Sequence, residues 1–253
     1  MAKQVTDRQG AATLVASSAE TNAAQLGAEF KKTFGPFLRE SDQAQLPDMA
    51  LVCRLVARRV RAVNEQLTRA SQAHDKELSD DAAPRAARDE AAATLTAEVV
   101  DIRVVIGRIY GPETLLRLGL HGKTPVEPKA ILETAKSLAG YLGDSAFAWP
   151  KPRRKGMTMV PSEWLADLQK PIADLDAALK DVAWEAREEQ ATGALKSHAM
   201  EANDEVFTRS ATFLSSTFVL LGHDALAGKV RPSKRRPGLV EPKPEEEATL
   251  PAK

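Results

Sequence analysis

This sequence has little cysteine, few aromatic residues and no net charge, and each shortage excludes a class of protein. Its one cysteine, Cys53, rules out an intramolecular disulfide and a cysteine-based zinc site. Aromatic residues make up 5% of the 253 residues, so the core must consist mainly of Ala, Leu and Val. Equal numbers of basic and acidic residues, 35 of each, leave no overall field that would attract nucleic acid or an anionic membrane.

Long hydrophobic runs are also missing. The N-terminal residues Met1–Asp7 lack the apolar core of a signal peptide. A membrane-spanning helix needs about 18 consecutive apolar residues. The most hydrophobic segment, 213–221, is interrupted by Ser215, Ser216 and Thr217. We therefore expect a cytoplasmic protein without a membrane span.

The apolar residues recur at the spacing of helices, and no segment shows convincing strand alternation. Between Pro47 and Gly111, apolar residues are separated by three and four positions, which places them on one helical face. The polar run 79–81 and the following Pro84 are typical of a turn between two helices. The sequence therefore predicts a long antiparallel helical hairpin over 47–111.

A second segment of similar length, 161–222, repeats this pattern. Each segment opens with a proline followed by a capping residue, Asp48 in the first and Ser162 in the second, and each ends in glycine. Thr192 and Gly193 are the turn-forming residues near the midpoint of the second segment. We expect an all-α fold with an internal duplication: two antiparallel long helical hairpins packed as a four-helix bundle, with additional shorter helices.

The segments between and around the hairpins mark the expected boundaries. A Gly/Pro/basic stretch separates the hairpins, and the C-terminal tail is too poor in apolar residues to offset its ordering entropy. The predicted organisation is a flexible N-terminus (1–10), an N-terminal helix with the first hairpin and a short helix at 128–142 (11–142), a linker (143–160), the second hairpin packed on the first (161–228), and a disordered tail that is first basic and then acidic (229–253).

Gly122, Lys123 and Thr124 match the last residues of a nucleotide-binding phosphate loop. The full motif needs another glycine five positions before Gly122, where this chain has Arg117. The motif must also follow a strand, and this segment follows a predicted helix. We therefore interpret the segment as a tight turn, in which the glycines allow positive φ angles and the neighbouring leucines close one end of the bundle.

The histidines form no recognisable metal or catalytic motif. Di-metal sites in helical bundles use Glu-x-x-His, and none of His74, His121, His198 and His223 has a glutamate three residues before it. Cys53 lies on an apolar helix face, and a Gly-x-Ser-x-Gly motif is absent. The sequence therefore predicts no metal, no cofactor and no catalytic residue. An enzyme whose site combines His74 with carboxylates is the alternative that only coordinates can test.

Two surfaces are candidates for binding a partner. The predicted last helix carries more apolar residues than one helical contact needs, and such a face can accept another helix. Two basic segments would form one anion-binding patch if the fold brought them together. The candidate partner-binding residues are Val206, Phe207, Phe213 and Phe218, with Val219 beside them; the candidate anion-binding residues are Lys151, Arg153, Arg154, Lys155, Lys234, Arg235 and Arg236.

These features favour a non-enzymatic helical scaffold, adaptor or assembly subunit that acts through protein–protein contacts, with another protein or with copies of itself. The alternative is a protein that binds nucleic acid or an anionic surface through the basic loop 151–155 and the tail segment 229–236. Binding of this second kind would weaken steeply with salt, which distinguishes the two functions.

Overall fold

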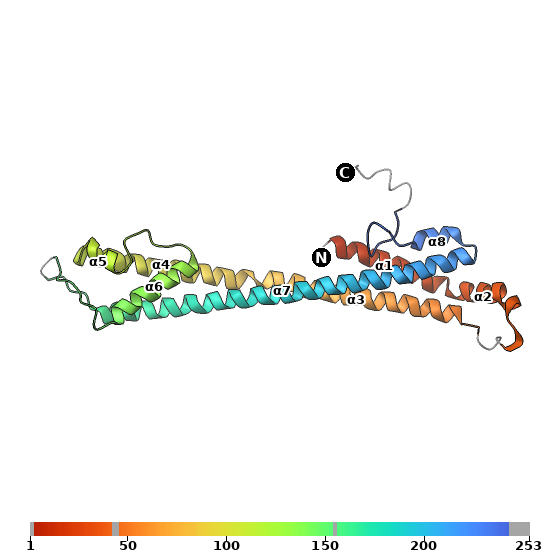
Figure 1. Cartoon of the computed structure of the whole chain (residues 1–253), viewed down its shortest axis with the longest axis horizontal. Coiled ribbons are helices and arrows are strands. Elements are labelled where there is room, and N and C mark those ends of the chain that lie inside the picture. The colour runs from red at the N-terminus through yellow and green to blue at the C-terminus, as the bar shows by residue number, and fades with distance from the viewer. Residues whose placement is uncertain (1–2, 42–45, 154–155, 243–253) are drawn as a thin grey trace. The chain divides into compact units, whose positions relative to one another are not determined.

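The computed structural model describes residues 3–41, 46–153 and 156–242, and these residues form an all-α structure (Figure 1). Within them, the only β pairing is an isolated bridge between Pro232 and Val240. The all-α fold and the long packed helices predicted from the sequence are therefore confirmed. The elements are α1 (Lys3–Thr21), α2 (Ala23–Phe34), the 3₁₀ helix η1 (Gly35–Phe37), α3 (Met49–Asp80), α4 (Ala82–Ile109), α5 (Pro112–Arg117), α6 (Pro128–Gly143), α7 (Pro161–Leu220) and α8 (Asp224–Val230).

The chain divides into two compact units. Unit 1 comprises Met1–Lys76 and Ala191–Lys253, and unit 2 comprises Glu77–Gln190. Helices α3 and α7 contribute residues to both units, because their bounds extend across these limits. Each unit has its own cluster of buried apolar side chains, which differs from the single four-helix core that two packed hairpins would give.

The core of unit 1 is rich in alanine. Residues of α1 and α2 pack against the first part of α3, the last part of α7 and α8. Alanine side chains allow helix backbones to approach closely, and the larger side chains fill the remaining space. The fully buried residues of this core include Ala16, Ala19, Leu26, Cys53, Ala57, Val60, Phe207, Leu214 and Phe218.

The core of unit 2 consists mainly of leucine and isoleucine. Helix α6 and the first part of α7 pack against α4, and the leucines that follow α5 close one end. Its fully buried residues include Leu95, Ile106, Ile131, Leu138, Leu168 and Leu175. An aromatic group of Tyr110, Tyr141, Phe147 and Trp149 covers the side of this core.

The second predicted hairpin is wrong, because Pro161–Leu220 is one continuous helix of 60 residues. The ring of His74 lies over Gly193, and its Nδ1 is 3.1 Å from the hydroxyl of Thr192. A glycine inside a helix costs only about 1 kcal/mol relative to alanine, and such packing offsets that amount. Because the second hairpin does not form, the predicted internal duplication is not confirmed.

The predicted turn at 79–81 is a one-residue interruption between α3 and α4. Asp81 keeps φ and ψ angles of −59° and −23°, which are helical and do not reverse the chain, so the predicted hairpin over 47–111 is wrong as well. Pro84 has no N–H and cannot bond to the carbonyl of Asp80, which accounts for the interruption. One turn later, Arg85 Nη2 donates to Asp81 Oδ2 at 2.6 Å and supports the helix.

The segments that were predicted to be loose are also structured within the described residues. Helix α1 begins at Lys3, and Val5 is buried. The predicted linker 143–160 lies inside unit 2, where Met159 joins the core. The first part of the predicted disordered tail forms the end of α8 and a small hairpin. The remainder, 243–253, lies outside the described residues, as do Arg154 and Lys155.

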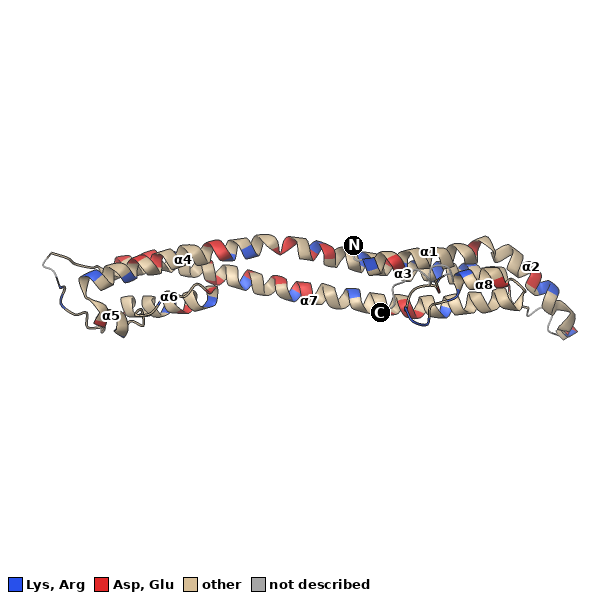
Figure 2. Ribbon diagram, turned by 90° about the horizontal axis from the view of Figure 1, so that it is seen from above, with Lys and Arg blue, Asp and Glu red and all other residues tan. Residues whose placement is uncertain are grey.

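Charge is mixed along the long helices. Figure 2 shows Lys and Arg interspersed with Asp and Glu along α3, α4 and α7, as expected for solvated faces. None of the described helices contains an apolar stretch of the length that a membrane crossing requires.

Candidate functional site

The end of α7 is followed by a sharp reversal that brings α8 back against it. Gly222 has a φ of +83°, a left-handed conformation that favours glycine, and the N–H of His223 donates to the carbonyl of Phe218 at 2.8 Å. Nε2 of His223 lies 2.5 Å from Oε2 of Glu29 on α2. Hydrogen bonds from Gln25 and from His223 hold the pKa of Glu29 below its ordinary value. The reversal therefore places α8 at a defined position on unit 1.

The segment after α8 folds into a small hairpin. The N–H of Ser233 donates to the carbonyl of Leu239 at 2.7 Å, and that of Glu241 donates to the carbonyl of Arg231 at 2.9 Å. Leu239 and Val240 pack against the core of unit 1. These contacts explain why residues up to 242 are ordered despite the Pro-rich composition that predicted disorder.

A salt bridge holds the tip of this hairpin in place. Nε and Nη2 of Arg8 donate to the two carboxylate oxygens of Asp204 at 2.7 and 2.8 Å. The hydrogen bonds that Arg8 donates to Asp204 are the main reason that the pKa of Arg8 is raised. Gly238, with a φ of +74°, lies directly over this pair, where a larger side chain would clash. The pair thus links α1, α7 and the C-terminal hairpin.

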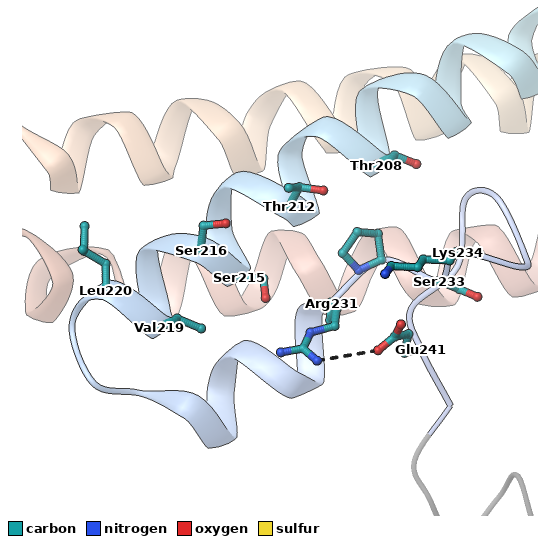
Figure 3. Close-up of a pocket in the computed structure, with 11 residues that line it drawn as sticks. Thr208, Thr212, Ser215, Ser216, Val219, Leu220, Arg231, Ser233, Lys234 and Glu241 are labelled. Atoms are coloured by element: carbon teal, nitrogen blue, oxygen red, sulfur yellow. Dashed lines mark ion pairs between the residues drawn. The ribbon is translucent and has the colours of Figure 1, made fainter.

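A groove of about 540 Å³ lies between the last turns of α7 and the hairpin (Figure 3). We call it the α7 groove. On the α7 side its residues recur every three or four positions and share one helix face. Its lining residues are Thr208, Thr212, Ser215, Ser216, Val219 and Leu220 of α7, and Arg231, Pro232, Ser233, Lys234 and Glu241 after α8.

The groove combines exposed apolar atoms with hydroxyl groups that have no protein partner. Val219 and Leu220 are 48% and 58% exposed. Ser215 Oγ donates to the carbonyl of Ala227 at 3.1 Å. In contrast, the hydroxyls of Thr208 and Thr212 make no hydrogen bond within the described residues. The face therefore offers both apolar contact and free hydrogen-bonding groups.

Positive charge lines one side of the groove. Arg231 Nη1 and Glu241 Oε2 are 3.9 Å apart, and both side chains are partly exposed, so this ion pair contributes little to stability. Lys234 has no carboxylate within ion-pair distance among the described residues. A second cavity of about 320 Å³ shares Ser233, Lys234 and Glu241 with the first, so the hollow surface continues past the hairpin.

The predicted partner-binding residues divide between the core and this surface. Phe207 and Phe218 are fully buried in the core of unit 1 and present no surface to a partner. Val206 and Phe213 are half-buried. Val219 lines the groove. The apolar excess noted in the sequence is thus largely used by the core of unit 1.

The predicted anion-binding residues fall in two different units. Lys151 and Arg153 belong to unit 2, whereas Lys234, Arg235 and Arg236 belong to unit 1, so each group has to be judged by itself. The guanidinium of Arg153 packs over Gly111. The backbone N–H of Arg153 donates to the carbonyl of Ile109 at 2.9 Å. The unit 1 group adjoins a cavity, since Lys234 lines the α7 groove.

Carboxylates gather at one place in unit 2. Glu77, Glu185 and Glu188 each place an oxygen within 4.8 Å of the others. Burial, and then repulsion from Glu77, Glu188 and Asp81, raises the pKa of Glu185. The sequence motifs did not indicate this group, because its members come from helices far apart in the chain and include no histidine. His74, the predicted candidate, instead contacts Thr192.

The lone cysteine behaves as the sequence predicted. Cys53 is fully buried in the core of unit 1, and burial raises the pKa of its thiol. A protonated, inaccessible thiol is a poor nucleophile.

Comparison with known protein families, curated proteins and solved structures finds no match for this chain, so its function has to be inferred from its own residues.

Proposed function

We propose that this protein is a non-enzymatic helical scaffold or adaptor that binds an amphipathic helix of a partner protein in the α7 groove. The exposure of Val219 and Leu220 inside a hollow surface is the observation that carries the proposal. Apolar side chains that line a concave surface, with polar groups around them, are typical of binding sites.

The dimensions of the groove suit a helical partner. Its α7 face extends from Thr208 to Leu220. At 1.5 Å per residue this is about 18 Å, or roughly three helical turns. A partner helix of this length places apolar side chains at positions i, i+3/i+4 and i+7, where they would meet Val219, Leu220 and the methyl groups of the threonines.

Charge complementarity favours an acidic partner. Arg231 and Lys234 lie on the groove, and Lys229, Arg235 and Arg236 belong to the same segment. Glu241 is the one carboxylate among the described lining residues, and it is already paired with Arg231. An acidic face on the partner helix would therefore speed association and fix its orientation.

A binding role fits the side-chain chemistry better than catalysis. The alternative enzyme required His74 to lie among carboxylates, and its ring nitrogen contacts a threonine hydroxyl instead. The α7 groove contains no histidine or cysteine among its described lining residues. The one carboxylate among those residues, Glu241, is paired with Arg231.

A substitution pair tests the proposal. Leu220→Glu introduces a negative charge into the groove, and the matched control Leu195→Glu makes the same change at a residue of α7 that is 65% exposed and lies outside the groove. Both side chains are largely exposed, so the fold should be retained. A photo-crosslinking amino acid at Thr212 would identify what occupies the groove.

We expect wild type and Leu195→Glu to retain the same crosslinked partner and Leu220→Glu to lose it. Equal retention by all three proteins would exclude the groove as the binding surface. Loss of the bound material after nuclease treatment, with a steep dependence on salt, would instead favour the anion-binding alternative through the basic segment 229–236.

A further inference from the structure

The segment that resembles the end of a phosphate loop forms a small cavity in unit 2. This cavity has a volume of about 150 Å³. It lies between α4, the loop that follows α5, and α6. Its lining residues are Val99, Arg103, Gly119, Leu120, His121, Gly122, Lys123, Thr124, Pro125 and Thr134.

The packing of the loop explains why the cavity is formed. Leu118 and Leu120 are buried in the core of unit 2 and anchor the loop on both sides of Gly119. Gly119 has a φ of +72°, which allows the sharp turn between these two leucines. The N–H of Leu120 donates to the carbonyl of Leu115 at 2.8 Å. The following residues are therefore held against α4 rather than projecting into solvent.

Three basic side chains line this cavity without an acidic counterpart. Arg103 is half-buried, and Nη1 lies 3.4 Å from the hydroxyl of Thr124. Among the described residues, neither Arg103 nor Lys123 has a carboxylate within ion-pair distance. His121 adds a third nitrogen base, and the described lining contains no Asp or Glu. A half-buried arginine without a carboxylate favours an anion beside it.

The loop backbone also has unused donors. The N–H groups of residues 121–124 donate to no acceptor within the described part of the chain. Successive free backbone N–H groups in a turn are a common feature of anion sites in proteins. The hydroxyl of Thr124 supplies a further donor.

We propose that this cavity binds a phosphate group, either free or carried by a small organic molecule. The cavity, of about 150 Å³, has room for a tetrahedral oxyanion. Arg103 contributes a fork-shaped donor, and Lys123 contributes a mobile point charge. The site differs from a nucleotide phosphate loop in following a helix and lacking the first glycine.

Arg103→Gln in the full chain tests the site, with Arg108→Gln as its matched control. Arg108 lies on the same helix, is exposed and does not line the cavity. Binding of inorganic phosphate, measured by calorimetry and by broadening of the ³¹P signal, should weaken about tenfold or more in Arg103→Gln and stay unchanged in Arg108→Gln. Lys123→Gln, at an exposed position, should weaken binding several-fold, and it keeps the test valid if Arg103→Gln fails to fold.

Two results would overturn the proposal. One is the absence of phosphate binding by wild type at millimolar concentrations. The other is an equal loss in Arg103→Gln and Arg108→Gln, which would indicate general attraction by surface charge. Phosphoserine added in place of inorganic phosphate distinguishes the sources: tighter binding of the ester identifies an organic phosphate as the ligand, and tighter binding of the free ion identifies inorganic phosphate.

Discussion

Units 1 and 2 solve the same packing problem with different side chains. The buried core of unit 1 contains many alanines, among them Ala16, Ala19 and Ala57, whereas that of unit 2 contains mostly leucine and isoleucine. Small side chains let helices approach closely, but each contributes little buried apolar area. Unit 1 must therefore depend on a few large side chains, above all Phe207 and Phe218, and on polar contacts between its elements.

The difference also bears on function. In unit 1, the C-terminal hairpin lies near the pair of Arg8 and Asp204, and the α7 groove forms between this hairpin and α7. Unit 2 closes its core with leucines from the loop after α5, and the same loop forms the small basic cavity. In each unit, the segment that covers the core also forms the candidate site.

The largest effect is expected from Phe207→Ala. Truncating this fully buried ring should lower the free energy of unfolding of unit 1 by about 3–5 kcal/mol, because the alanine-rich surroundings cannot fill the cavity. Cys53 is buried in the same core, so its reaction with a thiol reagent during urea unfolding reports on unit 1.

The corresponding substitution in the core of unit 2 is Leu138→Ala. The tryptophans Trp149, Trp164 and Trp184 all lie in unit 2, so fluorescence follows that unit. We expect Leu138→Ala to shift the fluorescence transition by about 2–5 kcal/mol and Phe207→Ala to shift the transition of Cys53. Identical shifts of both probes in both variants would contradict the separation into two cores.

A smaller effect is expected from Arg8→Ala. Its bidentate bond to Asp204 is mostly buried, with side-chain exposures of 14% and 17%, so its removal should destabilise unit 1 by about 1.5–3 kcal/mol. The control is Arg61→Ala, since the pair of Arg61 with Glu20 is exposed and should contribute little to stability. The reactivity of the Cys53 thiol in urea measures the destabilisation of unit 1 by each substitution. Equal destabilisation would show that the pair of Arg8 with Asp204 stabilises unit 1 no more than an exposed ion pair does.

The smallest effect concerns Glu185, whose pKa is raised above its ordinary value of 4.5. The carboxyl of Glu185 therefore binds its proton more tightly in the folded state than in the unfolded state. As a result, the free energy of unfolding falls as the pH rises from 4.5 through the pKa of the folded state. Glu185→Gln should remove this dependence and raise the melting temperature at neutral pH. The exposed Asp167→Asn on the same helix should leave the pH profile of unit 2 melting, followed by tryptophan fluorescence, unchanged.

Local signals in the sequence predicted several elements well. Helix α6 extends over Pro128–Gly143, close to the predicted 128–142, because a proline and the capping carboxylate of Glu127 define its start. The predicted cap at Asp48 is confirmed by the hydrogen bond from the N–H of Leu51, at 3.0 Å. These signals depend on residues within one turn of each other.

The wrong predictions share a different physical cause. Thr192, Gly193 and the polar run 79–81 consist of turn-forming residues, yet each position costs a helix only about 1 kcal/mol or less. Packing along the rest of a long helix outweighs that cost, and a sequence pattern cannot measure it. The α7 groove and the carboxylate group were missed for a related reason, since each combines segments that only the fold brings together.

Hydrogen exchange along α7 tests the central claim most directly. A continuous helix that contributes to two separate cores predicts slow exchange at Thr192 and Gly193, as in the helix around them. It also predicts that Leu138→Ala speeds exchange over 161–190 and leaves 203–218 unchanged. Fast exchange at Thr192 and Gly193, or equal acceleration over both parts of α7, would contradict the account.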